Sequence, residues 1–101
     1  VEREGREGFD YQHILSQNIS TCTLEAVLLT VKPGAKGRPT TSDGYEFKYL
    51  ISGRCDYQIN NEKITLEEGD SLYFDASVPH LPINTSGEKA VMLVVYFLMP
   101  K

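Results

Sequence analysis

The feature that most constrains the fold of this 101-residue chain is its division into eight short runs rich in β-branched and aromatic residues. Gly, Pro, Asn, Asp and Ser separate the runs, and helical periodicity is hard to find between them. The predicted strands are Tyr11–Leu15, Thr23–Val31, Glu46–Ile51, Cys55–Asn60, Lys63–Leu66, Ser71–Asp75, His80–Asn84 and Ala90–Leu98. Short strands at even spacing predict an all-β sandwich or barrel that buries alternate residues.

Two further patterns concern the connections and the last strand. Asn60-Asn61 predicts a tight hairpin turn, because both residues tolerate positive φ angles. Ala90–Leu98 shows no polar alternation except at Tyr96. We therefore expect this strand to be covered on both faces, by the core on one side and by a partner subunit or another strand on the other.

Composition narrows the class of protein. The net charge of −4 and the pI of about 5.1 argue against this segment gripping nucleic acid through phosphate neutralisation. No apolar run approaches the ~20 residues that cross a bilayer, and no leader pattern opens the chain, so the expected location is the cytoplasm. Cys22 and Cys55 lie in separate strands, where we expect small buried hydrophobes; a disulfide is possible but not required.

The start of the chain differs from the rest. Residues 1–8 read Val-Glu-Arg-Glu-Gly-Arg-Glu-Gly and are almost entirely polar. They predict a flexible linker or the cut edge of a longer protein, and residues 9–101 form the expected single domain.

Two segments carry the spacing of a known family. They read Glu46-x6-Gly53 and Gly69-x10-His80-x3-Asn84, and a short hairpin separates them. This pattern resembles the paired motifs of the cupin superfamily, over about residues 23–97. The resemblance implies a small, mostly antiparallel jelly-roll barrel, the cupin conserved barrel.

The departures from the family motifs concern its metal site. The two histidines of the first motif would fall near Thr40 and Ser42, or one residue earlier, and none of these positions is His. The three-histidine, one-glutamate site that the resemblance implies is thus reduced to Glu46 and His80. We expect no catalytic residue and no tightly bound cofactor, and at most a weakly bound divalent metal at these two side chains. The alternative is a pocket histidine that is hydrogen-bonded to the glutamate.

The residues within the two motifs indicate a particular group of cupins. Glu46-Phe-x-Tyr-Leu-x-x-Gly53, followed by Gly69-Asp-Ser-Leu-Tyr-Phe-Asp-Ala-x-x-Pro-His80, is similar to the C-terminal cupin domains of bacterial transcriptional regulators. Those regulators carry an N-terminal helix-turn-helix of the xenobiotic-response-element (XRE) type. The resemblance implies that DNA is bound only through such a domain, which this chain lacks, while the cupin senses a small molecule or dimerises.

The candidate ligand-binding residues are Glu46, Lys48, His80, Tyr57, Cys55 and Tyr73. Strand alternation places Lys48 on the same inner face as Glu46, where it pairs with that carboxylate or offers a cation to an anionic ligand. A bulge that turns Lys48 outward, or an amine that reaches the mouth, stays open as the alternative. Tyr57 and Cys55 are expected to face inward and Tyr73 to line the pocket, with core packing as the other role for each.

These features together predict a non-enzymatic effector-binding domain of a regulator, homodimeric through its apolar outer strands. A small molecule would enter the barrel and meet Glu46, Lys48 and His80. The alternatives are a metal-dependent cupin enzyme (an oxygenase, isomerase or decarboxylase), a stand-alone cupin binding protein, and a dimerisation module with an occluded barrel.

Overall fold

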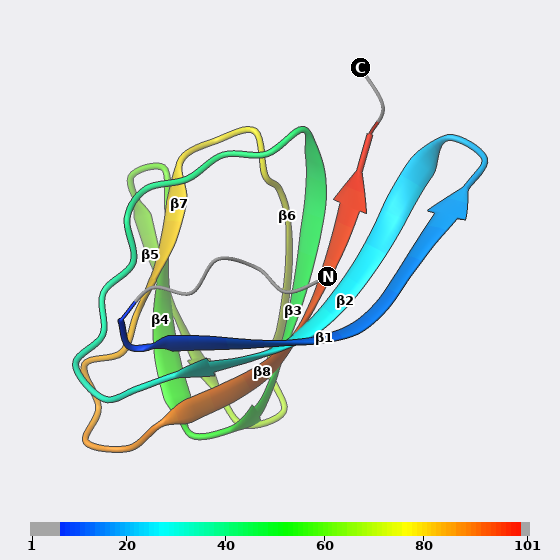
Figure 1. Cartoon of the computed structure of the whole chain (residues 1–101). Helices are drawn as coiled ribbons and strands as arrows, with labels where there is room; N and C mark the ends of the chain where they lie inside the picture. Colours follow the sequence, from blue (N-terminus) through cyan, green and yellow to red (C-terminus); the bar gives the residue numbers. More distant parts are fainter. Residues whose placement is uncertain (1–6, 100–101) are drawn as a thin grey trace.

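The computed structural model describes residues 7–99, which form eight strands and contain no helix (Figure 1). The strands are β1 (Phe9–Ile19), β2 (Cys22–Val31), β3 (Gly44–Ser52), β4 (Arg54–Ile59), β5 (Glu62–Glu67), β6 (Ser71–Asp75), β7 (His80–Ile83) and β8 (Ala90–Leu98). All eight predicted strands are present, so the all-β prediction is confirmed. Residues 1–6 of the predicted linker lie outside the described residues.

The strands form two antiparallel sheets. The larger sheet has the order β1-β2-β8-β3-β6, and the smaller has the order β5-β4-β7. Figure 1 shows the two sheets facing each other as a barrel, while the far half of the β1–β2 hairpin extends beyond it. Within residues 7–99 no helix has the length and hydropathy needed to span a membrane.

The core lies between the facing surfaces of the sheets. In β2 and β8 the alternate residues Val27, Leu29, Met92 and Val94 are at most 2% exposed. Burying one such side chain contributes about 1.5–3 kcal/mol. The residues between them in β8 point to the other side of the sheet and remain half-buried.

Glycine is required at both ends of β3, where this strand meets β8. Gly44 has a φ of 146°, and a Cβ there would lie 1.8 Å from the carbonyl oxygen of Phe97. Gly53 has a φ of 86°, and its Cβ would lie 2.3 Å from the carbonyl oxygen of Lys89. The close approach of the backbones explains why the first motif ends on Gly53.

Asn84, which ends the second motif, has a structural role. Its side chain is fully buried. Its amide nitrogen donates to the carbonyls of Val31 at 3.0 Å and Glu88 at 2.8 Å, and its oxygen accepts from the backbone nitrogen of Ser86 at 2.9 Å. Asn84 therefore fastens the turn after β7 to the end of β2.

The outer face of the larger sheet carries an apolar row across all five strands. The pairing register places Leu15, Ala26, Val95, Phe47 and Tyr73 side by side, one from each of β1, β2, β8, β3 and β6. We call these five residues the outer row. A sheet face exposed to solvent would carry polar side chains at these positions. The apolar outer row therefore supports the prediction that a partner covers this face, and that prediction remains untested.

Candidate functional site

An open cavity of about 630 Å³ lies inside the barrel. Strands of both sheets and the loop of residues 32–43 line it. Phe9, Leu29 and Leu98 contribute to an apolar part of the wall, whereas Glu46 and Lys48 contribute to a polar part. Cavities of this size and mixed lining hold small molecules.

Glu46 and Lys48 both point into this cavity from β3. Lys48 Nζ lies 2.8 Å from Glu46 Oε1, and each side chain is only 4% exposed. The rings of Tyr57, Phe74 and Tyr96 surround the ammonium, with centroids 5.0, 6.0 and 5.6 Å from Nζ. The inward orientation predicted for Lys48 is confirmed, and the outward alternatives are wrong, because the ion pair and these aromatic faces hold the amine inside.

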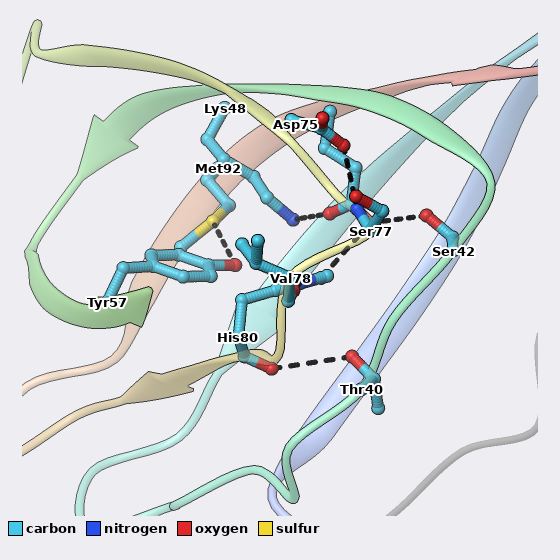
Figure 2. Close-up of polar contacts among 10 residues, drawn as sticks. Thr40, Ser42, Lys48, Tyr57, Asp75, Ser77, Val78, His80 and Met92 are labelled. Carbon is cyan, nitrogen blue, oxygen red and sulfur yellow. Dashed lines mark hydrogen bonds and ion pairs between the residues drawn. The ribbon is translucent and has the colours of Figure 1, made fainter. Parts of the chain in front are cut away.

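His80 reaches the same carboxylate from the start of β7. Its Nε2 lies 3.2 Å from Glu46 Oε2, and its Nδ1 lies 2.9 Å from the carbonyl oxygen of Val78. The edge of Phe74 packs against the imidazole, with centroids 4.9 Å apart. Figure 2 shows His80 and Lys48 on different elements of the chain. This geometry agrees with the alternative given from the sequence, in which His80 is a pocket histidine that is hydrogen-bonded to Glu46.

The carboxyl group of Glu46 is held in its ionised form. Burial alone would raise its pKa, but the hydrogen bond from His80 and the charge of Lys48 outweigh burial and lower the pKa from 4.5 to about 2. Glu46 is therefore ionised over the whole physiological pH range and accepts hydrogen bonds from its neighbours.

The loop of residues 32–43 closes one side of the site. The backbones of Thr40 and His80 exchange two hydrogen bonds of 3.0 Å, and Ser42 Oγ donates to Glu46 Oε2 at 3.3 Å. Figure 2 shows Thr40 and Ser42 along this loop, facing the cluster. Hydroxyl groups therefore stand close to the charged side chains at the positions where the sequence motif would call for histidines.

Comparison with known proteins assigns the family. Residues 27–96 match the sequence pattern of the Cupin_2 family, which is described as a cupin domain. This chain belongs to the Cupin_2 family. The predicted resemblance to the cupins is thereby confirmed. No curated protein matches the sequence.

Solved structures show the same cupin fold. The chain is similar to the Cupin_2 domain of an XRE family transcriptional regulator from Enterobacter cloacae, with 20% identity, a TM-score of 0.79, and coverage of 93% of this chain and 99% of that one. It is similar to an HTH_3 family transcriptional regulator from Vibrio cholerae, with 16% identity, a TM-score of 0.78, and coverage of 93% and 52%. It is also similar to KdgF from Halomonas sp., with 18% identity, a TM-score of 0.74, and coverage of 93% and 83%.

The donor set of this cupin does not fit a tightly bound metal. Among residues 7–99, no group of three or more His, Cys, Asp or Glu side chains is placed to hold a metal ion. Of the two ligand-type side chains present, Glu46 already binds the ammonium of Lys48 through Oε1. An ion here would have two protein ligands and a cation beside it. The weakly bound divalent metal stays a prediction.

The cupin barrel brings together four of the six predicted ligand-binding residues. Glu46, Lys48, His80 and Tyr57 all line the cavity. Tyr57 donates from its hydroxyl to Met92 Sδ at 3.6 Å, and burial raises its pKa well above the ordinary value. The inward orientation expected for Tyr57 is confirmed.

Cys55 and Tyr73 are not part of the cavity wall. Cys55 faces inward as expected and is 1% exposed, but it packs in the core, where burial raises its pKa to about 11. The prediction that Tyr73 lines the pocket is wrong. Tyr73 pairs with Phe47 across β3 and β6 and is 61% exposed on the outer face, stacked on Tyr45.

Several residues of the site were not predicted from the sequence. Phe74 packs against His80, and Tyr11 and Arg38 line the cavity. Phe74 was missed because its place on the inner face follows from the register that pairs it with Glu46, and the sequence alone does not supply this register. Arg38 lies in a loop, where no period indicates the direction of a side chain.

Proposed function

We propose that this chain is the small-molecule-binding domain of a bacterial transcriptional regulator, with the ligand inside the barrel. The observation that carries the proposal is the cavity of about 630 Å³ with Glu46, Lys48 and His80 in its wall. A buried charged cluster costs stability unless it is well paired, so its presence beside an open cavity favours a role in recognition. DNA would be bound by a helix-turn-helix domain outside this chain.

The structural neighbours support this proposal. Two of them carry names of transcriptional regulators, and one of those is the Cupin_2 domain of such a regulator, which the present chain matches over 93% of its length. Ligand binding would act through different affinities for two arrangements of the regulator, which its DNA-binding part would read.

We also propose that the domain forms a homodimer through the larger sheet. The outer row contains no charged residue, and Leu15 and Tyr73 within it are 46% and 61% exposed. An uncharged row can meet the same row of an identical copy without repulsion between like charges, as a two-fold interface requires. A second copy is therefore the occupant that we assign to this face.

Two measurements test the regulator proposal. The reading frame that precedes Val1 is expected to encode a helix-turn-helix domain, and a natural start codon at that point would contradict a regulator. Thermal unfolding of the purified domain against a chemically broad set of metabolites is expected to show stabilisation. Ligand at 100 times its dissociation constant adds about 2.7 kcal/mol to the free energy of unfolding.

Elemental analysis, an activity assay and the same unfolding experiment distinguish the rival functions. A metal-dependent enzyme would contain one metal ion per chain by elemental analysis and would lose its activity in His80→Ala. A dimerisation module with an occluded barrel would gain no stability from any compound. A tightly held metal in the purified domain would contradict the proposed reading of the site.

A further inference from the structure

The imidazole of His80 lies between two hydrogen-bond acceptors in this site. Both of its ring nitrogens face groups that accept hydrogen bonds: the carbonyl of Val78 at 2.9 Å and the carboxylate of Glu46 at 3.2 Å. A carbonyl has no hydrogen to donate, and neither has an ionised carboxylate. The two contacts can both be hydrogen bonds only when both nitrogens carry hydrogen atoms.

Lys48 provides a cation whose hydrogen-bonding capacity is not used up. Its ammonium has three N–H groups, and the acceptor that it meets is Glu46 Oε1 at 2.8 Å. Its other neighbours are the faces of Tyr57, Phe74 and Tyr96. Aromatic faces favour a cation, but they carry no net charge to neutralise it.

The cluster therefore has a surplus of positive charge. When both contacts of His80 are hydrogen bonds, Lys48 and His80 are two cations that share the single carboxylate of Glu46. This leaves one positive charge at side chains that are at most 5% exposed. The other charged residues of the cavity wall, Glu25 and Arg38, have opposite signs. An uncompensated charge in a buried cluster is costly, so a monoanion in the cavity would stabilise the site.

The remaining lining indicates the shape of that anion. Thr40, Thr41 and Ser42 line the cavity. The hydroxyls of Thr40 and Ser42 already donate to the carbonyl of His80 and to Glu46 Oε2, so the hydroxyl of Thr41 is the one that can donate to a further oxygen of an anion. The apolar part of the wall, which includes Leu29 and Leu98, suits a hydrocarbon or aromatic body rather than a second charged group.

From these observations we infer that the ligand is a small monocarboxylate with an apolar body, a specification that rests on the proposed small-molecule-binding function. Its carboxylate is bound by Lys48 and the hydroxyl-bearing loop, and its apolar body lies along the wall near Leu29. In this cupin the ammonium of Lys48 supplies the positive charge at the floor of the pocket.

Matched probes test the charge requirement. Thermal unfolding of the purified domain is measured at constant ionic strength with benzoate, benzamide, benzylamine, acetate and inorganic phosphate. Saturating benzoate is expected to raise the melting temperature by about 4 °C or more. Benzamide, benzylamine and phosphate are expected to leave it unchanged, and acetate to bind more weakly than benzoate because it has little apolar surface.

Variants of two lysines test the assignment to Lys48. In Lys48→Met the benzoate affinity, measured by calorimetry, is expected to fall by about tenfold or more. Lys63→Met is the matched control, because Lys63 is 65% exposed on the smaller sheet and pairs with Asp56 at 3.6 Å, outside the cavity wall. Its benzoate affinity is expected to stay within about twofold of the wild-type value.

A third variant keeps the inference testable if Lys48→Met does not fold. Glu46→Gln removes the internal carboxylate that competes for both cations, so benzoate is expected to bind more tightly. Unchanged or weaker binding in Glu46→Gln would overturn the inference, as would wild-type affinity in a folded Lys48→Met.

The outcomes separate this inference from the function on which it rests. Stabilisation by benzamide, benzylamine or phosphate equal to that by benzoate overturns the monocarboxylate assignment and leaves a small-molecule-binding domain. If none of these probes stabilises the domain, the monocarboxylate assignment is overturned. If the metabolite set also gives no stabilisation, the proposed small-molecule-binding function is overturned as well.

Discussion

At the scale of single residues, Glu46 links the site to the stability of the barrel. Its pKa is 4.5 as an ordinary carboxyl group and about 2 in the fold. Between these pH values the unfolded chain binds more protons at this residue than the folded chain does. The free energy of unfolding contributed by Glu46, on the order of 3 kcal/mol, is therefore complete above pH 4.5 and is lost as the pH falls toward 2.

Urea unfolding at pH 6 and pH 3 checks this prediction. The wild-type protein is expected to be more stable than Glu46→Gln at pH 6, and the difference is expected to shrink by about 2 kcal/mol at pH 3. Taking the difference between the two proteins cancels the titration of all other carboxyl groups. A difference that is equal at both pH values would mean that Glu46 is not held ionised by its cationic neighbours.

The sequence predicted part of the site because strand alternation was sufficient for some residues. Glu46 and Lys48 are two positions apart on one strand, so placing one inward places the other. The face of Tyr73 depends on the register between β6 and β3, which the sequence alone does not supply. The contact between His80 Nδ1 and the carbonyl of Val78 follows no periodic pattern, so the sequence does not predict it.

At the scale of elements, the β3–β8 pairing depends on Gly44. An alanine Cβ at this position would lie 1.8 Å from the carbonyl oxygen of Phe97, with backbone rather than a flexible side chain in its way. Gly44→Ala is therefore expected to lower the free energy of unfolding by at least about 2 kcal/mol. Gly87→Ala is the control, since a Cβ at Gly87 meets nothing within 4 Å, and its effect is expected within about 0.5 kcal/mol. Chemical denaturation of both variants measures the effects, and equal values would contradict the close approach.

Strand existence was predictable, and strand ends were less so, for a physical reason. Interior residues of a strand repeat every second position, whereas its ends are set by pairing with a neighbour. The predicted Tyr11–Leu15 extends in the structure to Phe9–Ile19, because β2 offers partners as far as Cys22. The turn that joins them has Ser20 at a φ of 34°, and serine gives only a weak signal for a turn of this kind.

At the scale of the whole molecule, the two faces of the larger sheet have different roles. The inner face carries the charged cluster and the cavity, and the outer face carries the outer row, in which Val95 lies at the centre, on β8. β3 contributes to both, since Glu46 points inward and Phe47 outward. A partner that covers the outer face would therefore contact the strand that holds Glu46 and Lys48, which would give the proposed ligand binding a direct route to the arrangement of a dimer.

The proposed dimer can be tested by a single substitution that adds one charge to the outer row. Val95→Lys would place an ammonium at the centre of the proposed two-fold interface, opposite its own copy, so the protein is expected to change from dimer to monomer in sedimentation equilibrium. Gln58→Lys adds the same charge to an exposed position on β4 in the smaller sheet, and this variant is expected to remain dimeric. Because the Val95 side chain points away from the cavity, monomeric Val95→Lys should still bind benzoate. Retention of the dimer in Val95→Lys would show that the outer row is not the interface, and a wild-type monomer would show that this face has a different partner.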